Sequence, residues 1–187
     1  MNTGKTSKEA ILQACRTIVS EQGLSALNMR SVAAQCHIAL GTLYNYYADK
    51  NELLLATVES VWADIFHMDQ PCTPACQSFA KYTEYIFTCI RRGAEEYPHF
   101  LTAHAMELAQ SQKDRGRDTM NHYFQHMKNG FLEVLKADKA VSPQAFSSAF
   151  SEMGFVIFVL EHLLILQIQG KSNCDTLLEV IRKVLYT

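Results

Sequence analysis

Apolar residues recur along much of the chain at intervals of three and four, the spacing that places side chains on one face of an α-helix. Gly23 is a stop signal for the first such series. Thr6 and Glu9 predict a capping box at its start. The apolar positions between these signals are Ile11, Cys15, Ile18 and Val19. The pattern therefore predicts a first helix over about residues 6–22.

Similar signals divide the rest of the chain, and no segment has the strict alternation of a β-strand. Asn28 and Asp49 are good N-cap residues, and Pro71 and Pro74 mark the clearest break. The further predicted helices span about 29–35, 39–46, 50–68, 74–93, 98–111, 114–137, 143–169 and 172–186. We therefore expect an all-α fold of about nine helices, with a three-helix head at the N-terminus and a C-terminal helical bundle.

The last two predicted helices indicate self-association. The helix over 143–169 is apolar around nearly its whole circumference and must be buried on all sides. The helix over 172–186 adds a second apolar stripe. Pairing this hairpin with its twin across a two-fold axis would bury both helices, so we expect a homodimer. The alternative is a monomer in which the first of the two helices lies deep in the core.

Composition agrees with a folded protein, because hydrophobic residues make up 48% of the chain and charged residues 19%. The formal net charge is −2, although residues 1–50 carry five Lys or Arg against three Asp or Glu. The first residues lack an apolar signal segment, and Met153 to Ile168 is too short for a membrane span. We therefore expect a cytoplasmic protein with reduced thiols that does not enter a membrane.

Residue patterns for catalysis are missing. The chain has no Gly-rich phosphate loop, no GxSxG and no clustered nucleophile and base. His122 and His126 could share a helix face, but no third ligand is placed by spacing. The six cysteines include no CxxC pair. We therefore expect no enzyme, no cofactor and no metal site.

Residues 28–47 meet the steric requirements of a helix-turn-helix. Ala33 supplies the small residue that two crossing helices need. His37 occupies the turn position that requires positive φ, which histidine tolerates better than most residues. The apolar residues expected to pack the second helix against the first are Cys36, Ile38 and Leu43.

The sequence from Gly41 to Tyr47, followed by Asp49 to Leu54, resembles the signature of TetR-family regulators. Gly23 and the stretch Arg30 to Ala33 also fit, so that the resemblance covers about residues 6–60. It implies a DNA-binding helix-turn-helix domain over 1–50. It also implies a ligand-binding and dimerisation domain over 51–187, with a linking helix over about 50–68.

The resemblance further implies a recognition helix in the major groove of DNA. Hydroxyl groups suit phosphates and base edges, and Leu40 suits a thymine methyl group. Two residues depart from the family pattern: Ala39 replaces the usual hydroxyl N-cap, and His37 replaces glycine. Tyr44 and Tyr46 could instead be packing residues, and Lys50 an ordinary solvated lysine. The expected DNA-binding residues are Arg30, Leu40, Gly41, Thr42, Tyr44, Asn45, Tyr46 and Lys50.

A pocket for a small molecule among the middle helices is likewise implied by the resemblance. Aromatic residues with polar tips, together with Met and His, suit a mainly apolar ligand, although a helical core needs the same residues. The candidate ligand-binding residues are Trp62, Tyr82, Tyr85, His104, Tyr123, Met127 and Phe155.

Together these features predict a homodimeric transcriptional regulator, which we expect to be a repressor. Its partners would be double-stranded DNA, a second copy of itself and a small, mainly apolar or aromatic effector that releases a roughly palindromic operator. Three alternatives stay open. They are an activator of the same fold, a helical small-molecule-binding protein without specific DNA readout, and an interaction protein whose C-terminal helices bind another partner.

Overall fold

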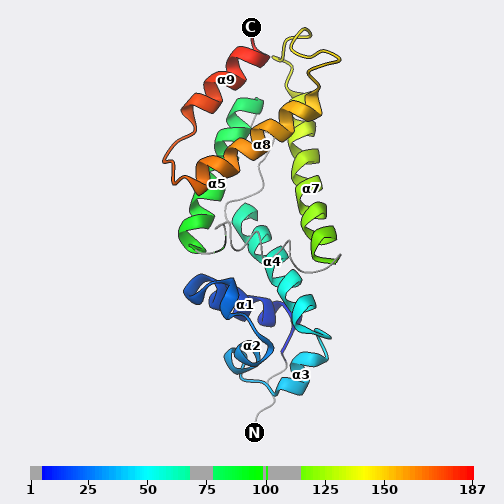
Figure 1. Ribbon diagram of the computed structural model, residues 1–187, viewed down its shortest axis with the longest axis vertical. Coiled ribbons are helices and arrows are strands. Elements are labelled where there is room, and N and C mark those ends of the chain that lie inside the picture. Colours follow the sequence, from blue (N-terminus) through cyan, green and yellow to red (C-terminus); the bar gives the residue numbers. More distant parts are fainter. Residues whose placement is uncertain (1–5, 68–77, 99, 101–114) are drawn as a thin grey trace. The chain divides into compact units, whose positions relative to one another are not determined.

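The computed structural model describes residues 6–67, 78–98, 100 and 115–187, and Figure 1 gives the order of the elements. These residues form eight α-helices and one short 3-10 helix. The only β-type pairing among them is an isolated bridge between Ser147 and Phe150. The predicted all-α fold is thereby confirmed. The ninth predicted helix, over 98–111, lies almost wholly outside the described residues.

Two compact units make up the chain. One consists of Met1–Ile65 with Gly93–Met120, and the other of Phe66–Arg92 with Asn121–Thr187. We call them the head unit and the body unit. In the parts that are described, no helix is long and apolar enough to cross a membrane.

The head unit begins with a helix whose cap differs from the predicted one. The Ser7 hydroxyl, not that of Thr6, accepts a hydrogen bond from the amide of Ala10 at 3.1 Å. Thr6 is used differently, because its carbonyl accepts a hydrogen bond from the Tyr46 hydroxyl. Gly23 ends this helix with φ 82°. The elements of this part are α1 (Lys8–Gln22), η1 (Leu24–Ala26), α2 (Met29–Gln35), α3 (Leu40–Tyr44) and α4 (Lys50–His67).

Four further helices lie wholly or mostly in the body unit: α5 (Phe79–Glu96), α7 (Arg115–Ala137), α8 (Glu152–Ile168) and α9 (Asp175–Leu185). The predicted start of α8 at residue 143 is wrong. Residues 138–151 form turns, and α8 begins after Ser151, whose hydroxyl caps the amide of Gly154. The predicted start of α5 at residue 74 lies outside the described residues, and α5 continues past Gly93 to Glu96.

Aromatic side chains form the centre of the body unit. Phe79, Phe131 and Phe155 are each at most 1% exposed. The ring of Phe79 lies 5.8 Å from that of Phe131 and 5.9 Å from that of Phe155. These contacts join α5, α7 and α8, and burial of such large rings is a main source of stability.

A buried carboxylate joins three segments of the body unit. Asp138 is 7% exposed and directly follows α7. Its Oδ2 accepts hydrogen bonds from the amide of Phe79 at 2.8 Å and from the hydroxyl of Tyr186 at 2.7 Å. Its Oδ1 accepts from the amide of Ala140 at 3.0 Å. Asp138 therefore caps α5 and holds the chain segment that follows α9.

We expect Asp138→Ala to lower the free energy of unfolding by roughly 2–4 kcal/mol, because it leaves the buried amide of Phe79 and the part-buried hydroxyl of Tyr186 without their acceptor. Urea denaturation measures the loss. Asp175→Ala, at an exposed position in the first turn of α9, is the control and should cost no more than about 1 kcal/mol. Equal small losses in both variants would contradict the role given to Asp138.

Candidate nucleic-acid interface

The second helix of the head unit has a reciprocal cap. The Asn28 side chain accepts hydrogen bonds from the amides of Arg30 and Ser31, at 3.1 and 2.9 Å. In return, the Ser31 hydroxyl accepts from the amide of Asn28 at 3.1 Å. Ala33 is 4% exposed, in agreement with a small residue at a helix crossing. The start of α2 is therefore set by residues close in the sequence.

The turn after α2 depends on one residue in the left-handed region. His37 has φ 54°, and it is the only residue other than glycine with positive φ in the described part of the chain. The amide of Ile38 then donates to the carbonyl of Ala33 at 3.0 Å, which closes the turn. The backbone predicted for His37 is confirmed, and it turns the chain toward α3.

The short helix α3 follows this turn. No side chain caps α3 at Ala39, although the amide of Thr42 bonds to the Ala39 carbonyl at 2.9 Å. Leu43 is fully buried and Tyr47 is 2% exposed, so that these two side chains attach α3 to the head unit. The ammonium group of Lys8 lies 5.7 Å from the centre of the Tyr47 ring. Packing, not capping, therefore holds this five-residue helix.

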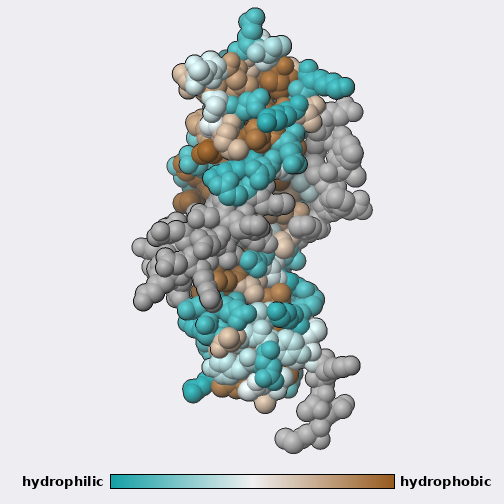
Figure 2. Space-filling model, turned by 90° about the vertical axis from the view of Figure 1, so that its right-hand side faces the viewer, coloured by the Kyte–Doolittle hydropathy of each residue, from teal (hydrophilic) through white to brown (hydrophobic). Residues whose placement is uncertain are grey.

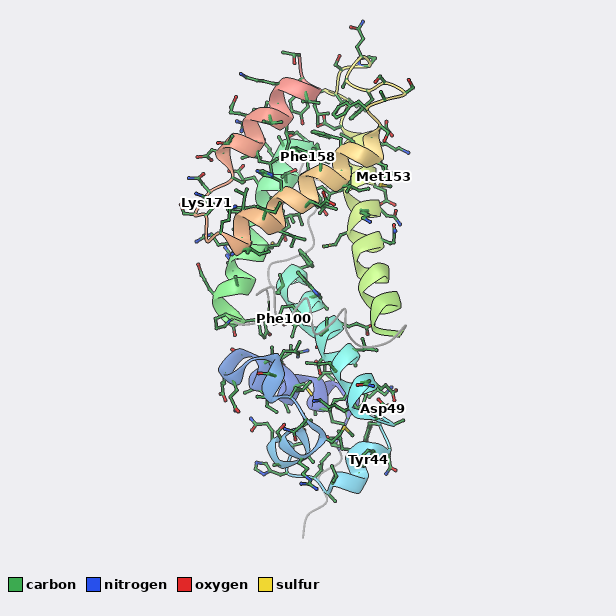
Figure 3. The ribbon with its side chains drawn as sticks, viewed as in Figure 1. Tyr44, Asp49, Phe100, Met153, Phe158 and Lys171 are labelled. Carbon is green, nitrogen blue, oxygen red and sulfur yellow. The ribbon has the colours of Figure 1, made fainter. Side chains whose placement is uncertain are left out.

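Four of the eight expected DNA-binding residues lie on α3, and two of these, Gly41 and Tyr44, are exposed. Tyr44 is 49% exposed and is labelled in Figure 3. A Cβ atom at Gly41 would meet nothing within 4 Å, so the backbone is open there. Arg30, Asn45 and Lys50 are also exposed, whereas Leu40, Thr42 and Tyr46 are half-buried.

Tyr46 has an intramolecular contact that the sequence does not reveal. Its hydroxyl donates to the Thr6 carbonyl at 2.7 Å and so attaches the chain before α1 to the region after α3. A tyrosine hydroxyl has one hydrogen to donate. Donation to a phosphate would therefore replace this bond, whereas acceptance from a base would not.

At the start of α4, fewer backbone amides are available to bind a phosphate than the sequence suggests. The Asp49 carboxylate accepts hydrogen bonds from the amides of Asn51 and Glu52, at 2.8 and 2.9 Å. The Glu52 carboxylate accepts from the amide of Ala48 at 2.7 Å. These amides already have partners, so a phosphate contact here would rest mainly on the exposed side chain of Lys50.

The expected ligand-binding residues divide between the two units. Trp62 is 4% exposed in the head unit, where its ring lies 5.4 Å from that of Phe100. In the body unit, Phe155 is buried and the Tyr82 ring lies 4.8 Å from that of Phe131. Two other members, Tyr85 on α5 and Met127 on α7, are half-buried. His104 and the side chain of Tyr123 lie outside the described residues.

A polar cleft of about 250 Å³ lies in the head unit, where α1 meets the end of α5. None of the expected ligand-binding residues lines it. Its lining residues are Gln13, Arg16, Thr17, Ser20, Glu21, Glu96 and Tyr97. Within the described ranges, no three His, Cys, Asp or Glu side chains gather as metal ligands.

Two ionisable groups are buried in the core of the head unit. Burial raises the pKa of the Cys15 thiol from its ordinary 9.0 to about 11. A hydrogen bond with Thr57 acts in the opposite direction, but its effect is smaller. Burial also raises the pKa of Tyr47 from 10.0 to about 12. In both cases the neutral form is favoured in the folded protein.

These shifts predict that the folded protein loses stability in alkaline solution. Below about pH 8 both groups are almost fully protonated whether the chain is folded or unfolded, so their contribution is fully present. As the pH rises toward the folded-state pKa values of about 11 and 12, only the unfolded chain releases its protons. The free energy of unfolding should therefore fall by roughly 3–4 kcal/mol by pH 11 from these two groups.

Urea denaturation under reducing conditions, at several pH values above neutrality, measures this loss. The double variant Cys15→Ala with Tyr47→Phe lacks both ionisable groups and should lose less stability over the same range. A decline of equal size in the double variant would contradict the assignment of the effect to these two residues.

Comparison with known proteins agrees with this geometry. Residues 11–57 match the family model described as bacterial regulatory proteins, tetR family. A repressor named KstR from Rhodococcus jostii is 37% identical over 57 residues, and KstR from Mycolicibacterium smegmatis is 39% identical over 51 residues. These matches cover 30% and 27% of this chain. The chain spans only about a quarter of the length of these relatives, 27% and 25%.

Solved structures are similar over nearly the whole chain. The multidrug-binding protein EbrR, complexed with proflavin, has a TM-score of 0.59 at 16% identity and covers 95% of this chain and 98% of its own. A TetR-family transcriptional regulator from Haemophilus influenzae has a TM-score of 0.53 at 18% identity, with 96% of each chain covered. At such low identity the likeness concerns the fold alone.

The matched residues 11–57 contain the capped α2, the turn at His37 and the exposed α3. Sequence match and local geometry therefore agree on the same segment. Residues 11–57 therefore form an N-terminal helix-turn-helix that matches the tetR family of bacterial regulatory proteins.

Proposed function

We propose that this protein is a DNA-binding transcriptional regulator of the cytoplasm that acts as a repressor. The observation that carries the proposal is the exposed side of α3, held by the buried residues Leu43 and Tyr47 beneath it. A short helix that is pinned from one side and open on the other is the arrangement that enters a major groove. The KstR relatives, which match this segment, are themselves named repressors.

We propose further that two copies associate through the outer side of α8. Phe158, Ile165 and Ile168 are 46%, 45% and 56% exposed, and their spacing of seven and three places them on one stripe. Val180 of α9 is 39% exposed. In Figure 2, apolar side chains reach the surface of the body unit among polar ones. A two-fold pairing would bury this stripe against itself.

A symmetric dimer should read a symmetric site. Its two recognition helices would contact half-sites about one helical turn, or 34–36 Å, apart. A nuclease footprint on the DNA upstream of the protein's own coding sequence tests this. We expect two protected half-sites related by a near-palindrome, whereas uniform weak protection would contradict sequence-specific binding.

The effector is proposed to be a small, mainly apolar or aromatic molecule bound in the body. EbrR binds the aromatic compound proflavin. In this chain, half-buried Tyr82, Tyr85 and Met127 offer suitable contacts on α5 and α7. Release requires that the molecule bind more tightly to the conformation that fits DNA poorly. Titration of the protein–DNA complex with aromatic compounds should then lower DNA occupancy.

Deletion of the gene distinguishes the two directions of regulation. Expression from the footprinted promoter should rise if the protein represses it, and fall if it activates it. If the purified protein binds aromatic compounds but protects no upstream site, it is instead a helical small-molecule-binding protein without DNA readout.

A further inference from the structure

Two helices that lead from the head unit into the body unit touch each other on the head side of the boundary. The residues in contact are Ile65 of α4 and Gly93 of α5. A Cβ atom added at Gly93 would lie 2.5 Å from Cγ1 of Ile65, and Ile65 is 1% exposed. The backbone of α5 therefore packs directly on a buried side chain of α4, with no room for a methyl group.

Just beyond this contact, a part-buried hydrogen bond attaches Tyr97, the residue after α5, to α4. The Tyr97 hydroxyl donates to Oδ2 of Asp64 at 2.6 Å, and Tyr97 is 3% exposed. Burial and the neighbouring Asp64 carboxylate raise the pKa of Tyr97 well above its ordinary value. The hydroxyl thus keeps its proton at physiological pH, and hydrogen bonds to a charged acceptor are among the stronger ones in proteins.

The same segment is also attached to α1. The Ser20 hydroxyl donates to the carbonyl of Glu96 at 2.7 Å. Phe100 then packs on Trp62 of α4 and on Tyr97, with ring centres 5.4 and 6.3 Å apart, and Figure 3 labels its position. The last turn of α5 therefore bonds to two different helices of the head unit.

We propose that Tyr97 is a positioning residue for DNA binding. Its hydroxyl, together with the Ser20–Glu96 bond, locks the end of α5 onto α1 and α4, so that these three helices keep one arrangement within the head unit. We call these four residues, Ser20, Asp64, Glu96 and Tyr97, the α5 clamp. This inference rests on the proposed function, because a fixed position of α3 within the head unit matters when two heads must fit one operator.

The length of α4 indicates how sensitive recognition would be to the clamp. Fourteen residues separate Asp64 from Lys50, which begins α4 close to the recognition helix. At 1.5 Å per residue this is a lever of about 21 Å, so a rotation of roughly 10° at the clamp would move its other end by about 4 Å. Such a displacement exceeds the tolerance of a hydrogen bond to a base edge.

The body unit provides a matched control. Tyr186 also donates its hydroxyl to a carboxylate oxygen, that of Asp138, at 2.7 Å. Tyr97→Phe and Tyr186→Phe thus each remove one tyrosine hydroxyl from an aspartate partner. We expect both variants to lose stability to a similar extent and to remain dimers. Only Tyr97→Phe should lower the affinity of the folded dimer for its operator, by about five- to tenfold, the effect of one charge-assisted hydrogen bond.

Two variants of the acceptor separate positioning from general damage. Asp64→Asn keeps an oxygen that can accept the hydroxyl proton and should retain most of the operator affinity. Asp64→Ala removes the acceptor and should lose as much affinity as Tyr97→Phe, and no further loss should follow when the two changes are combined.

Amide hydrogen exchange provides a second readout that needs no DNA. Exchange in the last turn of α5 should accelerate in Tyr97→Phe and stay unchanged there in Tyr186→Phe. Equal operator affinity of the two variants would overturn the proposal, as would unchanged exchange in the last turn of α5. If the unmodified protein binds no specific DNA, the proposed function fails, and the exchange experiment still decides whether the clamp exists.

Discussion

Ile165→Glu is expected to convert the dimer into monomers and to lower operator affinity at least about hundredfold. Ile165 is 45% exposed in the single chain, so a carboxylate there should not unfold the protein. In the proposed dimer, however, the two copies of this position would lie in an apolar contact. Two unpaired carboxylates would then be buried in this contact. The free energy that this costs is larger than the stabilisation that one pair of interface residues provides.

The loss of DNA affinity follows from the loss of the second head. A dimer that has bound one half-site offers its other head at a high effective concentration, and a monomer does not. Light scattering after size exclusion gives the mass, and fluorescence anisotropy gives operator affinity. Asn129→Glu, which adds a carboxylate at an exposed position of α7, is the control and should change neither. A variant Ile165→Glu that stays dimeric would refute the proposed interface.

The double variant Tyr44→Ala with Lys50→Ala is expected to lower operator affinity by about 30- to 300-fold, with the fold and the dimer intact. Both side chains are exposed, so their removal should cost little stability. Tyr44 supplies a hydroxyl and an apolar ring on the outer side of α3. Lys50 supplies a positive charge at the start of α4, where the nearby amides already bond to Asp49.

The two contributions can be separated by their dependence on salt. Loss of a phosphate contact at Lys50 should reduce the slope of log affinity against log salt concentration by about 1. Loss of Tyr44 should weaken binding with little change of slope if it contacts a base. Lys81→Ala removes an exposed lysine of α5 and serves as the control for charge. Unchanged DNA affinity in the double variant, with the dimer folded, would show that the DNA-binding residues were assigned wrongly.

The parts of the structure that could be predicted from sequence depend on neighbours in the chain. Asn28 caps the helix that begins at the next residue, and His37 adopts positive φ in the turn that follows this helix. The family signature from Gly41 to Leu54 lies in one continuous segment. Local patterns of this kind are visible without knowledge of tertiary contacts, and the head was predicted well for that reason.

The parts that were missed depend on residues far apart in the chain. Thr6 and Ser7 are equivalent candidates for a cap, and the Thr6 carbonyl bond to Tyr46, 40 residues away, is invisible in the sequence. Asp138 and Phe79 are 59 residues apart, and Asp64 and Tyr97 are 33 apart. No periodicity indicates such pairs, because only the tertiary fold brings them together.

The start of α8 illustrates a different kind of error. Ser142 and Pro143 form a typical helix start, and apolar residues follow them. In the structure these residues instead form turns, in which the amide of Ser142 bonds to the carbonyl of Leu185 at 2.7 Å. Phe146 stacks on Phe150 with ring centres 5.7 Å apart, so the apolar residues of this segment pack as a loop. A hydrophobic pattern alone does not distinguish the two outcomes.

We propose that this chain binds specific DNA sequences as a dimer. A salt titration of the purified protein on its own upstream DNA, with random DNA of equal length as the competitor, tests it most directly. We predict affinity at least about a thousandfold tighter for the upstream site, falling steeply as salt rises. Equal and weak affinity for both DNAs at every salt concentration would contradict the claim.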